Sequence, residues 1–215
     1  MFKAFCAILL AGCDAFPRDP NGALDEAKDD TLRVGAVSSP PWMMVDNGRV
    51  TGVDADLIRG FAESIGTKVE WVSGSESELL PILEHHELHL VAGGLVKATP
   101  WKKRVGLTNP YRREKVVVCS TNGGSLPDEI EDLPIGVKKG SSVIAEVTKK
   151  EGVPVVLDSP IGYLGLVAVH HRDMKKAGCG PARLTIAVHD HVMAIPKGEN
   201  GLLMALEEYL SAEGH

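Results

Sequence analysis

The sequence predicts an α/β fold, and three observations support this prediction. Strand-like and helix-like segments alternate from Thr31 onward, and a second, similar alternation begins at Pro134. The composition, with 44% hydrophobic and 24% charged residues, is that of an ordinary globular protein. The length of 215 residues fits one large domain or two small ones. Alternation of this kind favours mostly parallel sheets covered by helices.

The first alternation follows from periodicity and from turn residues. Apolar positions of 54–65 fall on one helical face that ends at Gly66, and Ser75 with Glu78 forms a capping box before a second apolar helix. The order is a strand at 32–37, a helix at 54–65, a strand at 68–72, a capped helix after Ser75, and a strand at 88–92 closed by two glycines.

The second alternation has the same character. Its expected elements are a strand at 134–137, a turn at 138–142, a helix at 143–150, a strand at 153–157, strand-like segments at 185–188 and 192–195, and an amphipathic helix at 202–210. No tract of low complexity interrupts them.

The N-terminal segment predicts export. Lys3 precedes a short apolar run that ends in Leu10-Ala-Gly-Cys13, which resembles a bacterial lipobox, so we expect residues 1–12 to be a signal peptide and Cys13 to carry lipid. The alternative is an apolar helix start with a stray cysteine. The charged, Pro- and Gly-containing segment 13–30 reads as a tether, and Asp14 resembles an inner-membrane retention signal. No run reaches the roughly 20 apolar residues of a membrane-spanning helix.

Charge and cysteine usage restrict the partners and the environment. The formal net charge is −6, with 23 basic and 29 acidic residues, so nucleic acid is not an expected partner. In an exported protein Cys119 and Cys179 could form a disulfide, but Cys119 lies in an apolar run, and a buried free thiol is an equal alternative.

Short phrases along the chain resemble one known family. They are Leu32-Arg-Val-Gly35, Pro40-Pro-Trp42, Gly52-Val-Asp-Ala-Asp-Leu57, Leu79-Leu-Pro-Ile-Leu83, Thr99-Pro100, Asn109-Pro-Tyr111, Ile135-Gly-Val-Lys-Lys-Gly-Ser141 and Ile195-Pro-Lys-Gly198. In this order they resemble family 3 extracellular solute-binding proteins of ABC transporters. The resemblance implies a two-lobe, type II periplasmic-binding-protein-like fold, in which each lobe is a mostly parallel sheet flanked by helices and a small ligand lies in a cleft between lobes.

Carried onto this chain, the resemblance implies lobe boundaries. Lobe one would comprise 31–115 and 190–215, and lobe two would comprise 116–189. Crossover strands would lie at 115–120 and near 186–195.

In lobe one the resemblance implies ligand contacts by Trp42, Gly94, Leu95 and Thr99, with Trp42 packing on the ligand side chain. The alternatives are ordinary packing for the tryptophan and simple turn chemistry for the glycine. Lys102 stands where the family has an arginine that binds the ligand carboxylate. Lysine lacks the planar fork of arginine, so Arg104 could take over this contact or could simply be exposed on a helix.

In lobe two the candidates are Ser141, Ser142 and Asp158. The two serines open a predicted helix and could bind an anion, or they could only cap that helix. Asp158 resembles the family's acidic residue for a ligand ammonium group, and a turn role in Asp-Ser-Pro is the alternative. Asp54 and Asp56 begin a helix, and we assign them to capping.

The eight histidines predict neither a metal site nor a cofactor. His85, His86 and His89 are close in sequence, and His189 and His191 would share a strand face, but no carboxylate or cysteine set has ligand spacing around them. We expect a solvent-facing histidine cluster.

The sequence therefore predicts a monomeric, non-enzymatic lipoprotein. It would be held at the periplasmic side of the inner membrane by its lipid alone and would capture an amino acid or a related anion or zwitterion for an ABC permease. One alternative is an enzyme that resembles cyclohexadienyl dehydratases and recruits Asp158, Glu114 or a histidine. The other is a ligand-sensing partner of a membrane protein.

Overall fold

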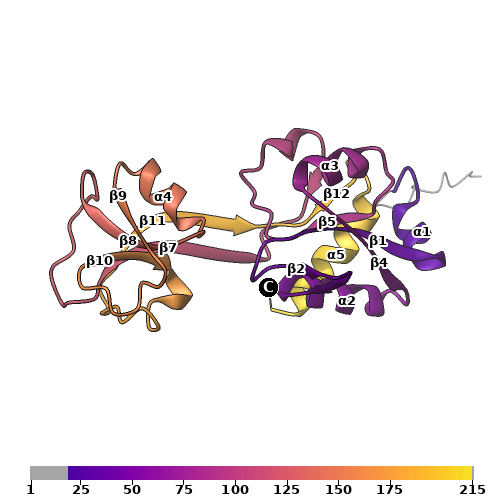
Figure 1. Ribbon diagram of the computed structural model, residues 1–215. Coiled ribbons are helices and arrows are strands. Elements are labelled where there is room, and N and C mark those ends of the chain that lie inside the picture. The colour runs from indigo at the N-terminus through magenta and orange to yellow at the C-terminus, as the bar shows by residue number, and fades with distance from the viewer. Residues whose placement is uncertain (1–18, 215) are drawn as a thin grey trace, which may run out of the picture. The chain divides into compact units, whose positions relative to one another are not determined.

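The computed structural model describes residues 19–214, which form two compact units (Figure 1). Unit 1 contains the described residues up to Gly94 together with Trp101–Thr108 and Met193–Gly214, and unit 2 contains Leu95–Pro100 and Asn109–Val192. No helix of the described residues combines the length and the apolar character that a membrane span requires. The predicted signal peptide and the lipidation site Cys13 lie outside the described residues.

Unit 1 is a five-stranded sheet with helices. Its elements are α1 (Ala23–Asp29), β1 (Thr31–Val37), β2 (Met44–Asp46), β3 (Arg49–Thr51), α2 (Val53–Ser64), β4 (Lys68–Gly74), α3 (Glu76–Glu84), β5 (Leu90–Ala92), β6 (Gly106–Leu107), β12 (Ala194–Ile195) and α5 (Asn200–Ala212), and the short helix η1 spans Pro100–Lys103. The strand order is β4-β1-β5-β12-β6. Strands β4, β1 and β5 are parallel, whereas β12 runs antiparallel to both of its neighbours.

Local sequence patterns explain the helices of unit 1. In α2 the residues Leu57, Ile58 and Phe61 are buried on one face, as the periodicity predicts. The capping box of α3 is present, and the backbone N–H of Ser75 donates to Oε2 of Glu78 over 2.8 Å.

The interpretation of 13–30 as a tether is wrong for the residues of α1. Ala23 and Ala27 of this helix are buried. The side chain of Asp19 accepts hydrogen bonds from the backbone N–H groups of Gly201 and Leu202 at the start of α5, and it also accepts one from Leu24. Two alanines among many charged residues are too weak an apolar period to reveal a helix that is stabilised by contacts with the opposite end of the chain.

Replacing Asp19 by alanine should lower the free energy of unfolding by about 1–2 kcal/mol, because the first N–H groups of α5 lose their acceptor. Asp25→Ala is the matched control, since Asp25 is 86% exposed and lies 3.9 Å from Lys28. Denaturant unfolding monitored by circular dichroism measures both. Equal unfolding midpoints for the two variants would show that Asp19 does not hold the N-terminal segment.

Unit 2 contains the second five-stranded sheet. Its elements are β7 (Arg112–Ser120), β8 (Pro134–Lys138), α4 (Val143–Lys149), β9 (Val153–Leu157), β10 (Leu166–His170), η2 (His171–Asp173) and β11 (Leu184–His191). The strand order is β11-β7-β10-β8-β9. Strands β10, β8 and β9 are parallel, and β7 is antiparallel to β10 and to β11.

The two long strands lie where the chain enters and leaves unit 2 (Figure 1). The long segment of unit 2 runs from Asn109 to Val192, whereas the resemblance implied 116–189. The difference arises because β7 already pairs with β11 at Arg112, opposite His191. Residues 112–115 are thereby part of the second sheet.

A disulfide joins Cys119 of β7 to Cys179, with the two Cα atoms 5.7 Å apart. The structure thus has the disulfide rather than the free-thiol alternative. Around it pack buried side chains from β7, from β10 and from the segment after η2, namely Val117, Val167, Val169, Met174 and Ala177. The sequence did not predict β10, because its five residues lie in a segment that matches the family pattern poorly.

Candidate functional site

In unit 1 the loop after β5 is fixed by a buried carboxylate. The side chain of Asp54 is fully buried and accepts hydrogen bonds from the N–H groups of Gly93 at 3.2 Å and Gly94 at 2.9 Å. Asp54 lies in the first turn of α2, as the sequence predicts, but the sequence did not predict that its carboxylate bonds to a loop that is distant in sequence. Asp54 holds the end of β5 in place.

Trp42 packs against this loop. A Cβ atom on Gly94 would lie 2.7 Å from Cδ1 of Trp42, and Gly94 has a φ of +73°, so only glycine fits here without strain. Trp42 follows a cis Pro40-Pro41 bond and is only 6% exposed, and Leu95 is 1% exposed. The structure thus places Trp42 and Gly94, two of the predicted ligand contacts, next to each other. Their contact with a ligand stays a prediction.

The two cations considered for anion binding have different surroundings. Arg104 forms a forked ion pair with Glu84, in which Nε donates to Oε1 at 3.0 Å, and its guanidinium lies 4.7 Å from the ring centroid of Trp101. The hydrogen bond from Arg104 holds the pKa of the Glu84 carboxyl below its usual value. Thr99, another predicted ligand contact, is buried. Lys102 in η1 is exposed and makes no ion pair within the described residues. Lys102 is therefore the cation that remains available to an anion.

In unit 2 the three parallel strands end at one edge beside a cavity. Strands β8, β9 and β10 end at Lys138, Leu157 and His170, and the cavity at this edge has a volume of about 350 Å³. Both Ser141 and Asp158 line this cavity. Ligands of open α/β sheets bind at the carboxyl ends of parallel strands, so the cavity lies where such a site is expected.

The two predicted serines do not share one environment. Ser141 lines the cavity, and its hydroxyl also accepts a hydrogen bond from the N–H of Val143 at 3.2 Å, so it faces the cavity and caps α4 at once. Ser142 is exposed, is the N-cap residue of α4 without a side-chain cap bond, and is not among the residues that line the cavity.

Sequence reasoning missed further polar residues of this cavity, chiefly Lys138, His170 and Asp173. Nδ1 of His170 lies 3.1 Å from Oε2 of the buried Glu114. Burial lowers the pKa of His170 from the ordinary value of a histidine, while the nearby Asp173 opposes this change. The apolar run that ends at His170 is the one sequence signal that could have placed this residue at a strand end.

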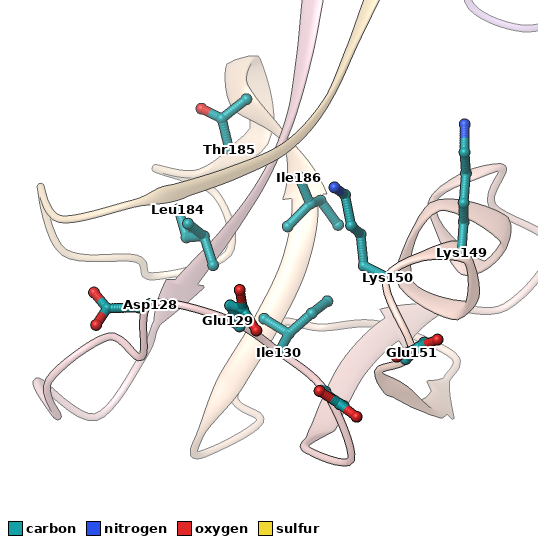
Figure 2. A pocket seen from close by; sticks show the side chains of 10 residues that line it. Asp128, Glu129, Ile130, Lys149, Lys150, Glu151, Leu184, Thr185 and Ile186 are labelled. Atoms are coloured by element: carbon teal, nitrogen blue, oxygen red, sulfur yellow. The ribbon is translucent and has the colours of Figure 1, made fainter.

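A second cavity of unit 2, of about 390 Å³, lies at the opposite ends of the strands (Figure 2). Its lining comes from the acidic segment 128–131 before β8, the end of α4 and the start of β11, with Ile130, Leu184 and Ile186 as its apolar part. None of the predicted site residues lines it. The two cavities have similar volumes, so volume does not distinguish them. The cavity at the carboxyl ends of the strands is the candidate site because Ser141 and Asp158 line it.

Comparisons with known proteins show the family and the fold of this chain. The model of the bacterial extracellular solute-binding proteins, family 3, matches residues 32–212. The chain belongs to this family. A structure of an ancestral cationic amino acid solute-binding protein is similar to this chain, with a TM-score of 0.66 and 21% identity, and the similarity covers 89% of this chain and 93% of that one. This likeness shows the shared two-lobe α/β fold.

Two curated relatives are also similar to this chain. A probable histidine-binding protein of Campylobacter jejuni is 27% identical over 142 residues, which is 64% of this chain and 56% of that protein. The membrane-bound lytic murein transglycosylase F of Vibrio vulnificus is 28% identical over 135 residues, which is 62% of this chain and 25% of that protein. The chain thus matches little more than half of one relative and a quarter of the other.

The prediction of a solvent-facing histidine cluster is wrong for His89 and His191, whereas His85 is exposed. His89 is 1% exposed, its Nδ1 accepts the N–H of Arg33 at 3.0 Å, and its Nε2 lies 3.3 Å from a carboxylate oxygen of Glu26. His191 is 3% exposed. The two are buried because each is packed with a carboxylate that is distant in sequence. In the described part of the chain no group of three or more acidic, histidine or cysteine side chains is arranged to hold a metal ion.

Proposed function

We propose that this protein is a non-enzymatic binding protein that captures a small polar solute, an amino acid or a related anion or zwitterion, for an ABC transporter. The observation that carries the proposal is the cavity at the carboxyl ends of β8, β9 and β10. Its lining includes Ser141, Asp158, Lys138 and His170. A volume of about 350 Å³ lies within the range of small-molecule sites, which is roughly 300–1,000 Å³.

The charges around this cavity suit a zwitterion. The Asp158 carboxylate can accept hydrogen bonds from a ligand ammonium group, and the Ser141 hydroxyl and the Lys138 ammonium can donate to a ligand carboxylate. In unit 1, Lys102 is a separate candidate for contact with an anion, as a point charge without the fork of an arginine. Two similar proteins, a probable histidine-binding protein and an ancestral cationic amino acid solute-binding protein, support an amino acid as the ligand.

The location and the transport partner extend this proposal. The family is described as extracellular, which agrees with a periplasmic protein. The lipobox-like segment that ends at Cys13 supports lipid anchoring, and Asp14 supports retention at the inner membrane. An anchored monomer would deliver its solute to an ABC permease in the same membrane. Labelling of the protein with a fatty acid in a bacterial host, and its loss in Cys13→Ala, would test the anchor.

A thermal-shift screen of the purified protein tests the proposed function. A ligand that binds only the folded state raises the melting temperature, so at least one amino acid or related anion should raise it at millimolar concentration. No shift with amino acids, organic acids or polyamines would contradict the proposal.

The variant Asp158→Asn should weaken binding of that ligand by about 10-fold or more, because a charge-assisted hydrogen bond in the cavity becomes a neutral one. Asp128→Asn is the matched control, since it removes the same charge from unit 2 at the other cavity. The concentration dependence of the melting temperature measures both variants. Equal weakening in the two variants would mean that only the overall charge matters.

One observation favours an enzyme as the second candidate. The close approach of His170 and Glu114 beside the cavity is a geometry that acid–base chemistry could use. The transglycosylase relative is a weaker argument, because only a quarter of its length matches this chain. Turnover of prephenate or arogenate that is lost in His170→Ala would favour this candidate over binding alone.

A further inference from the structure

The lining of the proposed solute cavity in unit 2 separates charged from apolar side chains. Its lysine and aspartate residues are all exposed or half-buried; they are Lys138, Asp158, Asp173 and Lys176. Its buried residues are all apolar and at most 7% exposed; they are Val143, Ala168, Val169 and Ala177. A ligand therefore meets charged groups at the mouth of the cavity and hydrocarbon in its buried part.

Two of the four charged lining residues already pair with each other. The Asp173 carboxylate lies 3.6 Å from Nζ of Lys176 and 3.7 Å from Nε of Arg172. Lys138 and Asp158 make no ion pair within residues 19–214. The cavity thus offers one ammonium group and one carboxylate to a ligand, which match the single carboxylate and the single ammonium group of an α-amino acid.

A charged group on the side chain of the ligand would have no partner in the buried part of the cavity. Moving an ammonium, guanidinium or carboxylate group from water into such surroundings costs free energy unless an opposite charge compensates it. An apolar side chain instead gains about 25 cal/mol for each Å² of its surface that leaves water. The lining therefore favours a ligand whose side chain is uncharged and apolar.

Ile161 adds an apolar side chain to the lining from an exposed position. It is 66% exposed, and its backbone N–H donates to Oγ of Ser159 at 3.1 Å. The loop that carries Ile161 is joined to the end of β7, because Oγ1 of Thr121 accepts the N–H of Gly165 at 3.1 Å. A ligand in the cavity can cover Ile161 and so remove further apolar surface from water.

We propose that the solute is an α-amino acid with an uncharged, apolar side chain and that Ile161 contacts this side chain. This inference rests on the proposed function, because it concerns the solute of the same cavity. It narrows the ligand class: amino acids with a cationic or an anionic side chain are not the preferred solutes.

Isothermal titration with single amino acids tests the ligand class. Leucine, valine and phenylalanine are the apolar probes, and lysine, arginine and glutamate are the charged probes. At least one apolar probe should bind at least about 10-fold more tightly than every charged probe. Tighter binding of a charged probe would overturn this inference and leave the proposed function standing. No binding of any amino acid would contradict the proposed function itself.

A pair of variants on one loop tests the contact by Ile161. Ile161→Asp should weaken binding of the tightest apolar probe by at least about 10-fold, because the ligand side chain loses an apolar neighbour and gains a charged one. Leu164→Asp is the matched control and should leave the affinity unchanged, since Leu164 is 77% exposed and does not line the cavity. Unchanged affinity in Ile161→Asp, or equal loss in both variants, would overturn the proposed contact.

Discussion

Removing the disulfide with Cys119→Ala/Cys179→Ala should lower the free energy of unfolding of unit 2 by about 4 kcal/mol. The bond closes a loop with a sequence separation of 60, and closure of a loop of this size restricts the unfolded chain by about that amount. It also ties the segment after η2 to the buried strands β7 and β10. Denaturant unfolding under oxidising conditions measures the difference.

The reductant dependence provides the control for this prediction. Dithiothreitol should destabilise the unmodified protein by a similar amount and should have no effect on the double alanine variant, which has no bond to reduce. If the unmodified protein unfolds at the same denaturant concentration with and without reductant, the two cysteines are not bonded in solution, and the buried free thiol is the correct alternative.

Asp54→Ala should destabilise unit 1 by about 3 kcal/mol. The change leaves the N–H groups of Gly93 and Gly94 without the buried carboxylate that accepts their hydrogen bonds. The loop after β5, against which Trp42 packs, should then lose its fixed position. The measurement is the denaturant midpoint, followed together with tryptophan fluorescence.

Asp56→Ala is the control for Asp54, because it lies two residues further along the same helix. The Asp56 side chain is 78% exposed and pairs with Arg59 at 3.1 Å, so its removal should cost less than about 1 kcal/mol. Similar losses in the two variants would mean that Asp54 acts only on the helix N-terminus, as the sequence suggested.

Features that depend on local pattern could be predicted from the sequence. The apolar face of α2 and the capping box of Ser75 and Glu78 repeat within a few residues, and both are present in the structure. The α/β fold class and the two-lobe family fold were likewise correct. The reason is that hydrophobic periodicity and turn chemistry act over one or two turns of chain.

Features that depend on distant partners could not be predicted. Helix α1 is stabilised by Asp19 and by contacts with the start of α5, more than 170 residues away, and nothing in its own sequence signals them. The burial of His89 against Glu26 likewise depends on a partner that is distant in sequence, as does the pairing of Arg104 with Glu84. From sequence alone, a charged residue is expected to be exposed, because its distant partner cannot be recognised.

The candidate site shows both cases. Ser141 and Asp158 follow strands that the sequence predicted, and the structure brings both to one cavity. His170 was missed because β10, which ends at this residue, was not predicted. Ser142 lies beside the cavity-lining Ser141 without lining the cavity itself. Strand ends could be located from sequence, whereas the direction of each side chain at those ends could not.

Isothermal titration of the unmodified protein and of Asp158→Asn, with the amino acid that gives the largest thermal shift, tests the central claim most directly. The proposed function predicts saturable binding of one ligand per chain, weakened by about 10-fold or more in the variant. An affinity that is unchanged by Asp158→Asn, or the absence of heat with every amino acid tried, would contradict it.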